Sequence, residues 1–586
     1  MLSWFQHRKK EIFLLIIFIA LGAFLRTYQW VDWLHFEVDQ SYDAKVVNQA
    51  ITGGIGQLPL LGQVAGSEAL RLGPAYYYLE YASALIFGNT PQGHASFVII
   101  LSIAAIFLFY VVCRRYFAVP VALALLAIFS VSQYLVLYSR FSWNPNILPF
   151  FFLLITYALL RSVSKQEPRQ SFWFLIAAGA MAIATQLHFN SFFIVPAVIA
   201  VFLIAKRPHF NLRIWLGAVA IILLVYAPVI TNEIVSGGEN IQYFTHKIDS
   251  ENQKESPALA TVALQGVHYT AFESFLVLSG IDKIHGKNEF SLQRFIPNLQ
   301  CGTASQLTCG SNFIAKILAT AILVGSLVML VIRLLKNMEA PKKDFLVLMA
   351  IWSVLAFLYF SALIFADYTM RPRFFLLTAP LAFILFGFVL ELLQPERGRL
   401  HLSLLILVTA GFLATNLLAI NKSFTLLGKV ATEPLDLETE DIFPDKPRLT
   451  LDVQMAITEY METEYQKNGF PIYFRSDISE YIPVFRYHLD ASQTPWLGTL
   501  SPDSAYTEGN YFLITSSLGN TDKKMARYAE TYTLSQKKTF GSLVIFRLEP
   551  KPSIIIALRQ PVGQKEISAQ EEKIGQMRVW NNLFHR

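Results

Sequence analysis

The sequence predicts an α-helical polytopic membrane protein that ends in a small α/β domain. Its 586 residues are 54% apolar and only 15% charged, whereas soluble proteins average about 25% charged residues. Several apolar runs reach the roughly 18 residues or more that mark a helix crossing a bilayer. Beyond residue 420 these runs stop and the pattern becomes that of a soluble domain. Together these observations fix the class of the protein.

Eleven segments are predicted to cross the membrane. The first of them is expected to remain as a helix and not to be cleaved as a signal peptide, because its apolar core is too long and no small-x-small pattern follows it. The predicted spans cover residues 11 to 30, 94 to 112, 118 to 137, 146 to 163, 172 to 187, 190 to 205, 212 to 232, 312 to 335, 345 to 366, 373 to 393 and 400 to 420. An odd number of spans places the two termini on opposite sides.

Lysine and arginine in the connections predict the orientation, because cytoplasmic loops carry an excess of them. The alternate short connections hold only Arg140, Arg371 and Arg373. The N-terminus is therefore predicted to be cytoplasmic, in an inner or plasma membrane. The basic set comprises residues 7 to 10, Arg114, Arg115, Arg161, Lys165, Arg169, Lys206, Arg207, Arg213, Arg333 to Lys343, Arg397 and Arg399. Basic residues divided in this way reflect topology and do not indicate a nucleic-acid surface.

The predicted domains follow from this orientation. Residues 1 to 420 form the transmembrane domain, with a first outer loop at 31 to 93 and a second at 233 to 311. Residues 421 to 550 form an extracytoplasmic domain, and 551 to 586 a tail. In the C-terminal domain, ITEYMETEYQ and KKMARYAETY are predicted helices, while PIYFR, YFLITSS and TFGSLVIFRLE are predicted strands. The tail includes a charged run, QKEISAQEEK, that we expect to be solvated.

Cysteines add one expectation about the second outer loop. Cys301 and Cys309 bracket a polar stretch, CGTASQLTCG. Outside the cytoplasm a small-loop disulfide between them is plausible; two free thiols are the alternative.

Polar residues at the outer ends of the spans suggest a site. Asp39 and Asp43 lie four residues apart in a segment with helical spacing, so their carboxylates should share one helical face. Arg140, His188, Arg371 and Arg373 also fall at outer ends, although more than 330 residues separate the first from the last of these six positions. One outward-facing site accounts for this distribution most simply.

Two arginine-containing segments suggest phosphate binding. Arg140 lies shortly before Asn144 and Pro145, and Arg371 and Arg373 flank Pro372. Proline favours the first position of a helix, and a cation there is unfavourable unless an anion is present. The segments could therefore hold a phosphate. The alternatives are ordinary helix-start chemistry for Asn144 and arginines that extend to lipid headgroups.

The remaining candidates are aromatic or polar residues that could contact a substrate. They are Tyr76, Tyr77, Tyr138, Asn144, Asn146 and His188. The tyrosines at 76 and 77 follow a Gly-Pro turn in an aromatic helix expected at the membrane surface, where an interfacial aromatic belt is the alternative. A lone histidine such as His188 is often structural. The sequence contains no Walker loop, HExxH, CxxC pair or GxSxG, so we expect neither a metal nor a cofactor.

Several motifs, in their order, resemble a known family. DQSYDA, GPAYYYL, SRFSWNPNILPFF, QLHF and RPRFFLLTAPL look like the bacterial membrane glycosyltransferases of the GT-C fold. The nearest likeness is to family 39, the protein-mannosyltransferase and aminoarabinose-transferase-like group. The resemblance covers about residues 10 to 395. It implies inverting transfer of a sugar from a polyprenyl-phosphate carrier to a protein, lipid or glycan acceptor on the outer side of the membrane.

The resemblance also implies a role for the first outer loop. In such enzymes the first-loop aspartate is the general base, which maps onto Asp39. Many relatives have Asp-Glu there, whereas this chain has Asp39 and Gln40, and Asp43 is the candidate substitute for the missing acid. Arg140, Arg371 and Arg373 would stabilise the phosphate leaving group. A transporter or flippase of lipid-linked sugars is the alternative from another class; it predicts polar residues at mid-span depth.

Overall fold

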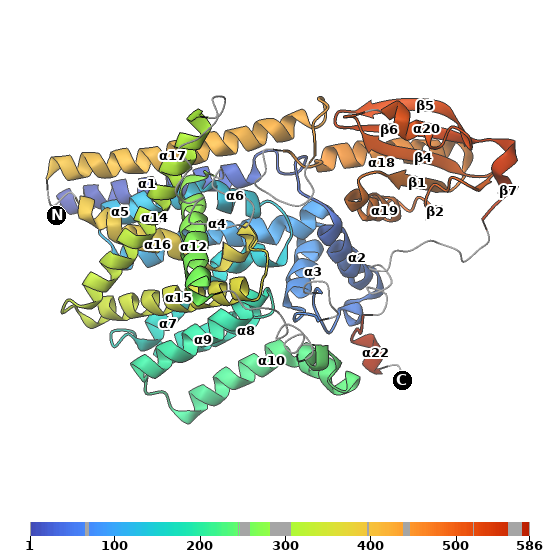
Figure 1. The fold of residues 1–586 in the computed structure, drawn as a ribbon. Coiled ribbons are helices and arrows are strands. Elements are labelled where there is room, and N and C mark those ends of the chain that lie inside the picture. The colour runs from blue at the N-terminus through green and yellow to red at the C-terminus, as the bar shows by residue number, and fades with distance from the viewer. Residues whose placement is uncertain are drawn as a thin grey trace.

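A bundle of long helices makes up most of the chain, and a β-sheet domain lies at one end of it (Figure 1). The N-terminus lies at the opposite end of the bundle. The structure is a computed structural model, and it describes residues 2–64, 70–243, 245, 258–281, 306–394, 398–437, 446–519, 521–560 and 577–584.

Helices are present at all eleven predicted spans. In chain order they are α1 (Leu2–Thr27), α4 (Pro91–Tyr116), α5 (Val119–Val131) with α6 (Gln133–Tyr138), η2 (Asn144–Ile147) with α7 (Leu148–Val163), α8 (Gln170–Ala184), α9 (Phe189–Lys206), α10 (Leu212–Ser236), α14 (Gln306–Leu334), α15 (Ala340–Phe365), η3 (Pro372–Thr378) with α16 (Ala379–Leu390) and η4 (Glu391–Leu393), and α17 (Arg399–Lys429). In the described part of the chain, eight helices are long and apolar enough to cross a membrane. The protein is a multi-pass membrane protein.

The helix that follows Pro372 lies at the centre of this bundle. Within its most apolar stretch 83% of the residues are buried, against 11% for α10 at the periphery. Apolar side chains of α4, α5 and α7 surround it, with Phe109, Phe129 and Phe383 in mutual ring contact. The residues that begin this helix, Arg371 to Arg373, are therefore carried by the most firmly packed element of the bundle.

Helix α12 (Leu259–Ser279) was not predicted. It falls in the predicted second outer loop, where polar residues such as His268 and Glu273 interrupt the apolar pattern, so no element was predicted there. The helix crosses the long axes of α1 and α17 in Figure 1. Its last turn is fixed by two hydrogen bonds, from Ser132 Oγ to the Val277 carbonyl and from Asn416 Nδ2 to the Leu278 carbonyl, each 2.7 Å. This part of the second outer loop is thus packed against the bundle.

The first outer loop contains α2 (Val38–Gly53), η1 (Ile55–Gln57) and the predicted aromatic helix, α3 (Ala75–Phe87). The described end of the chain, which includes α22 (Asn581–Phe584), packs against this loop. Pro59 and Val579 form an isolated antiparallel bridge, and the Leu60 N–H donates to the Arg578 carbonyl over 2.9 Å. The charged run that we expected to be solvated lies outside the described residues.

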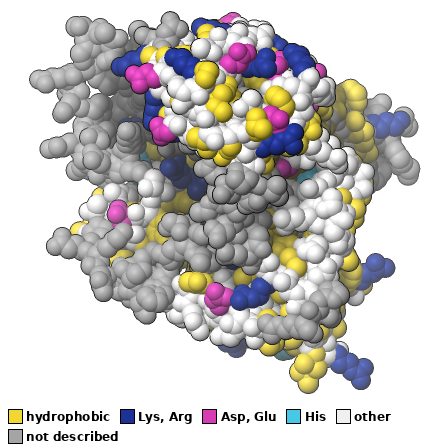
Figure 2. All heavy atoms as spheres, turned by 90° about the vertical axis from the view of Figure 1, so that its right-hand side faces the viewer, with side chains coloured by type: hydrophobic (Ala, Val, Ile, Leu, Met, Phe, Trp, Pro, Cys, Tyr) yellow, Lys and Arg dark blue, Asp and Glu magenta, His cyan; other side chains and the backbone are white. Residues whose placement is uncertain are grey.

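The C-terminal domain contains a five-stranded sheet in the order β2-β1-β4-β6-β5. Strand β1 is parallel to β2 and β4, while β6 is antiparallel to β4 and β5. Its elements are α18 (Leu451–Asn468), β1 (Ile472–Ser476), η6 (Ser479–Tyr481), α19 (Ile482–Ala491), β2 (Trp496–Gly498), β3 (Ala505–Tyr506), β4 (Asn510–Ser516), α20 (Thr521–Ala526), β5 (Tyr532–Phe540), β6 (Leu543–Pro550), η7 (Pro552–Ile554) and β7 (Ile555–Ala557). Viewed from this end, the domain carries charges of both signs with apolar side chains between them (Figure 2).

Most of the elements expected in this domain are present. The predicted helix ITEYMETEYQ lies in α18, and the three predicted strands lie in β1, β4 and β6. The expected helix KKMARYAETY was too long: α20 ends at Ala526. Strand β5 was missed, because seven of its nine residues are exposed and show no apolar alternation. The last bundle helix continues to Lys429, beyond the predicted domain boundary at residue 421.

The predicted disulfide cannot be placed. Cys301 lies outside the described residues, and so does the side chain of Cys309. Cys113 is a buried free thiol.

Candidate active site

Helix α2 begins in the first outer loop and carries both predicted acidic residues. Glu37 is its N-cap, and the Glu37 N–H donates to Gln40 Oε1 over 3.1 Å as part of a capping box. Asp39 lies in the first turn, where a negative charge is favourable because the N-terminal N–H groups are not paired within the helix. The prediction that Asp39 and Asp43 belong to one helix is confirmed.

Asp39 lines a cavity of about 260 Å³ built from four distant segments of the chain. The first outer loop, the connection after α6, the segment before α16 and the C-terminal domain each contribute to it. The lining residues are His35, Glu37, Val38, Asp39, Gln40, Tyr138, Phe141, Trp143, Arg371, Pro372, Arg373, Arg448 and Glu480. Three acidic side chains and three arginines are in this set: Glu37, Asp39, Glu480, Arg371, Arg373 and Arg448. The cavity is therefore a polar pocket with carboxylate and guanidinium groups in its wall.

The Asp39 carboxyl group is accessible to solvent through the cavity, although protein surrounds it. Burial raises its pKa above the ordinary value, and this effect outweighs the opposing influence of Arg373, of a hydrogen bond with Trp143 and of Arg448. Burial disfavours the charged form, whereas a nearby cation or a hydrogen-bond donor favours it. A carboxylate with a raised pKa is a stronger proton acceptor than an ordinary surface aspartate.

The segment from Arg371 to Arg373 is held by its backbone. Tyr134 donates its hydroxyl proton to the Pro372 carbonyl over 2.6 Å, and the Tyr269 hydroxyl donates to the Arg371 carbonyl over 3.2 Å. Asn190 Nδ2 donates to the Phe374 carbonyl over 2.6 Å. The prediction that Pro372 opens a helix is confirmed, with Arg371 at the N-cap position of η3. These bonds fix the backbone that presents both guanidinium groups to the cavity.

An aromatic wall lies beside these groups. Tyr138 and Trp143 stack with ring centroids 6.5 Å apart, and Phe141 and Trp143 are 5.9 Å apart. The Arg373 guanidinium lies over the Trp143 ring, 5.2 Å from its centroid. A cation in this position is attracted by the face of the ring. The aromatic wall thus orients Arg373 and, through Trp143, contacts Asp39.

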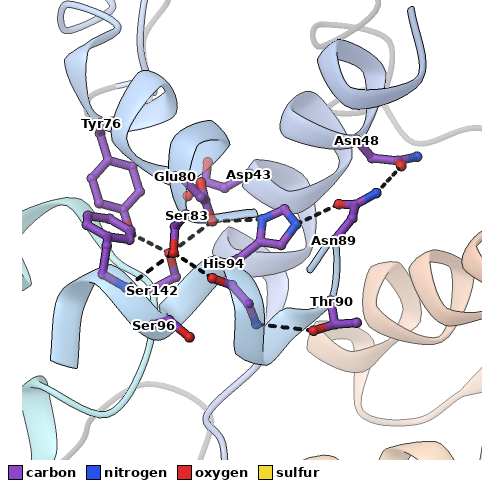
Figure 3. Close-up of polar contacts among 12 residues, drawn as sticks. Asp43, Asn48, Tyr76, Glu80, Ser83, Asn89, Thr90, His94, Ser96 and Ser142 are labelled. Atoms are coloured by element: carbon purple, nitrogen blue, oxygen red, sulfur yellow. Dashed lines mark hydrogen bonds and ion pairs between the residues drawn. The ribbon is translucent and has the colours of Figure 1, made fainter. Parts of the chain in front are cut away.

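Asp43 lies outside this cavity, in a buried polar cluster (Figure 3). It accepts hydrogen bonds from Gln63 and Tyr77, and its carboxyl group lies next to that of Glu80. Glu80 in turn lies 3.3 Å from His94 Nδ1 and accepts from Ser142 Oγ over 2.9 Å. Burial, then the charges of Glu80 and Asp39, raises the pKa of Asp43 well above its ordinary value. The structure therefore gives no support for Asp43 as a substitute acid in the cavity.

Arg140 also lies outside the cavity, which corrects our expectation that it would contact a phosphate there. Its side chain turns toward the end of α1, where Nη1 donates to the Leu25 carbonyl (3.1 Å) and the Arg26 carbonyl (3.3 Å). The guanidinium also lies 4.8 Å from the centre of the Phe424 ring. A cation stabilises the carbonyl-rich C-terminus of a helix. The sequence argument considered only the helix that follows Arg140 and missed the one that its side chain reaches.

Five further candidates have structural partners and do not line the cavity. The Tyr76 hydroxyl lies 2.6 Å from Ser142 Oγ, and Tyr77 bonds to Asp43. Asn144 Nδ2 donates to the Leu187 carbonyl over 2.5 Å, and Asn146 Nδ2 to the Phe141 carbonyl over 3.0 Å. Asn144 is the first residue of η2, and Trp143, not Asn144, holds the N-cap position. Of the predicted substrate contacts, Tyr138 alone is in the cavity wall.

His188, the last of these candidates, caps helix α9. Its Nδ1 accepts from the Asn190 N–H over 3.2 Å, and its ring lies 5.7 Å from that of Phe374. Burial, followed by the charge of Arg373, lowers the pKa of His188 to about 3. The imidazole is therefore neutral and positions the segment after Arg373.

The cavity residues that were not predicted from the sequence include His35, Glu37, Phe141, Trp143, Arg448 and Glu480. Trp143 lay within the motif SRFSWNPNILPFF, three residues from Arg140, and Glu37 lies just before the motif DQSYDA, two residues from Asp39. Nothing in the sequence connected Arg448 and Glu480 with the first outer loop. Among the residues that the structure describes, no group of three or more His, Cys, Asp or Glu side chains could hold a metal ion.

The chain is similar in sequence to one protein family and in structure to several solved membrane proteins. A family model described as dolichyl-phosphate-mannose-protein mannosyltransferase matches residues 72–231. The crystal structures of ArnT from Cupriavidus metallidurans in the apo state and bound to undecaprenyl phosphate each match with a TM-score of 0.51 at 12% identity. They cover 91% and 93% of this chain, and 97% and 99% of their own. The chain therefore has the GT-C fold, and residues 72–231 match a glycosyltransferase family model.

A further structural match is the archaeal oligosaccharyltransferase AglB from Archaeoglobus fulgidus, with a TM-score of 0.48 at 11% identity, covering 96% of this chain and 76% of that one. No curated protein sequence matches the chain. The matched region of the family model includes Tyr138 and Trp143 but not Asp39, Arg371 or Arg373. The GT-C fold predicted by the resemblance is confirmed, while the roles of individual residues depend on the geometry of the cavity.

Proposed function

We propose that this GT-C protein transfers a sugar from a polyprenyl-phosphate carrier to an acceptor on the outer face of the bacterial cell membrane. One observation carries the proposal: Asp39, Arg371 and Arg373 line the same cavity, although more than 330 residues of sequence separate Asp39 from the two arginines. A structure of ArnT, which has the same fold, is bound to undecaprenyl phosphate. A carrier of this chemical class has a phosphate for the arginines and an isoprenoid tail for the bilayer.

Asp39 would act as the general base. An acceptor hydroxyl is a weak nucleophile, and its attack on the anomeric carbon is assisted when a carboxylate removes its proton. In a single displacement, the new bond forms between the acceptor oxygen and the anomeric carbon while the bond from that carbon to the phosphate oxygen breaks. The proton moves to Asp39, and the electron pair leaves with polyprenyl phosphate. Inversion of configuration at the anomeric carbon follows.

Arg371 and Arg373 would stabilise the leaving group. The lipid phosphate gains negative charge as the bond to the sugar breaks, and fixed cations in a partly water-excluded cavity lower the free energy of that state. Arginine suits this role because its planar guanidinium can donate two parallel hydrogen bonds to one phosphate. Neighbouring Trp143 and Tyr138 offer flat apolar faces against which a sugar ring could pack.

Two observations support an outer-face site. The cavity includes residues of the C-terminal domain, and this domain lies at the end of the bundle opposite the N-terminus. Basic residues gather in the connections on the side of the N-terminus, which favours a cytoplasmic location for that side. The acceptor would then be a protein, lipid or glycan of the cell envelope.

The proposal is tested with purified protein in lipid nanodiscs. A panel of undecaprenyl-phosphate-linked monosaccharides is supplied together with cell-envelope extract, and mass spectrometry follows the release of undecaprenyl phosphate and the gain of a sugar by the extract. We expect release that requires the extract, with inversion at the anomeric carbon. If no donor of the panel is consumed, or if intact donor crosses the membrane of reconstituted vesicles without transfer, the transferase proposal fails and a flippase is favoured.

A further inference from the structure

The C-terminal domain contributes directly to the candidate active site. We infer that Arg448 of this domain is a positioning residue, which binds Glu37 and thereby fixes the first turn of α2 and the place of Asp39 in the cavity. The inference rests on the proposed function, because it assigns a purpose to Arg448 only if Asp39 is the base. The C-terminal domain would then have a role in positioning the first outer loop.

The Glu37 carboxylate is held by the C-terminal domain at both oxygens. Arg448 Nη1 donates to Oε2 over 2.6 Å, and the Tyr481 hydroxyl donates to Oε1 over 3.0 Å. The Tyr481 oxygen also accepts from the Leu449 N–H over 3.1 Å, so it is itself fixed. Glu37 is 7% exposed. Hydrogen bonds between charged partners in such buried surroundings are stronger than neutral ones, so the attachment is a firm one.

Other contacts hold the chain on the N-terminal side of Glu37. The Asp452 N–H donates to the Asp32 carbonyl over 3.0 Å, and Gln454 Nε2 donates to the Phe36 carbonyl over 2.9 Å. The Phe36 ring packs against Tyr487, with centroids 5.1 Å apart. The segment that leads into α2 is therefore attached to α18 at residues 32 and 36 and to α19 at residue 36.

This attachment reaches Asp39 through the start of the helix. Glu37 is the N-cap of α2 and pairs with Gln40 in the capping box. Asp39 lies between these two residues, in the first helical turn. A helix start moves as a unit, because its N-cap and first turn share hydrogen bonds. A shift of Glu37 would consequently displace the Asp39 carboxylate relative to Arg373 and Trp143.

Arg448 also influences the charge of Asp39. Its positive charge favours the ionised form and so lowers the pKa of Asp39, in the same direction as Arg373. His35 adds no charge, since burial and Arg448 hold its pKa well below the ordinary value; its ring nitrogen can accept from Arg448 Nη1 at 3.3 Å. The ionisable groups that face Asp39 from the surrounding elements are His35, Glu37, Asp43, Arg371, Arg373, Arg448 and Glu480.

The decisive variant removes both charges of the pair. Arg448→Gln alone would leave the Glu37 carboxylate buried without its cation, which destabilises the fold. The double variant Glu37→Gln/Arg448→Gln avoids this, because it removes both charges together and leaves no buried carboxylate without its cation. Arg448→Lys keeps the charge, and Arg475→Gln, at an exposed position on β1 of the same domain, is the matched control.

Two readouts separate positioning from mere stability. Hydrogen exchange measured by mass spectrometry reports on peptides that cover the first turn of α2, with undecaprenyl phosphate present in nanodiscs. The pH dependence of sugar transfer reports on Asp39. In the folded double variant we expect faster exchange at residues 38 to 43. We also expect an acid limb shifted toward higher pH by about 0.5 unit, because a displaced Asp39 loses contact with Arg373 and Trp143, which favour its ionised form. Arg448→Lys should restore the acid limb, and Arg475→Gln should match the wild type.

The two proposals fail in different ways. A folded double variant with wild-type exchange and an unshifted acid limb overturns the role of Arg448, while loss of transfer in Asp39→Asn would still support the base. Full transfer by Asp39→Asn overturns the base assignment and with it the catalytic purpose of Arg448, whatever the exchange rates show.

Discussion

Asp39 and Asp43 lie one turn apart on α2, yet Asp39 opens into the cavity and Asp43 is buried beneath it against Gln63 and Glu80. Two carboxyl groups on one helical face thus lie in different environments. Asp39 lines the cavity and can be reached by a substrate that enters from the solvent, whereas Asp43 does not line it.

This difference predicts opposite outcomes for two matched substitutions. Asp39→Asn should lower the rate of sugar transfer by about 10²-fold or more, as expected for the loss of a general base. Asp43→Asn should retain most of the activity, since an amide reproduces the shape and hydrogen bonds of a protonated carboxyl group. Single-turnover transfer assays on both proteins measure the effect. Equal loss of activity in the two variants would contradict the assignment.

The raised pKa of Asp43 predicts a specific dependence of stability on pH. In the unfolded chain this carboxyl group releases its proton near its ordinary pKa of about 4, whereas the folded protein holds the proton to higher pH. The folded state then binds more protons, so stability falls as the pH rises from about 4 through the folded pKa. Asp43→Asn should remove this contribution. Thermal unfolding of the two proteins in nanodiscs from pH 4 to pH 9 should show a flatter dependence for the variant.

The two cavity arginines predict a loss of carrier binding. Arg371→Gln and Arg373→Gln should each weaken binding of undecaprenyl phosphate by about tenfold, the scale of one charge-assisted hydrogen bond to a phosphate. Arg140→Gln is the control, because its guanidinium binds the end of α1 and lies outside the cavity. Microscale thermophoresis in detergent measures the dissociation constants. Binding weakened as much by Arg140→Gln as by the other two would argue for a general charge effect.

Arg140 should instead matter for stability. Its substitution by alanine leaves the Leu25 and Arg26 carbonyls without this donor, at an expected cost of about 1 to 3 kcal/mol in the free energy of unfolding. A lower midpoint of thermal unfolding with unchanged affinity for undecaprenyl phosphate is the expected result. An unchanged midpoint would show that these two bonds add little to the fold.

Much of the fold could be predicted, because apolar runs of membrane length report directly on helices. Helix α12 could not, since buried polar residues such as Glu273 break its apolar pattern. The side chains that fix its last turn, Ser132 and Asn416, come from distant parts of the chain. In the site, the positions of Asp39, Arg371 and Arg373 followed from the side of the membrane on which they fall. The prediction that Arg140 binds a phosphate was based on the neighbouring sequence alone. It missed the carbonyl groups that Arg140 contacts, because they are 114 and 115 residues away in the chain.

Arg448 was beyond prediction for the same reason, and its contact has a consequence for biosynthesis. Glu37 and Arg448 are separated by 411 residues, which at 5 to 20 residues per second take roughly 20 to 80 seconds to synthesise. The newly synthesised first loop therefore lacks this contact until the ribosome has passed residue 448. A translation product that ends between residues 430 and 447 would contain every predicted membrane helix but not Arg448, and we expect it to be inactive in sugar transfer.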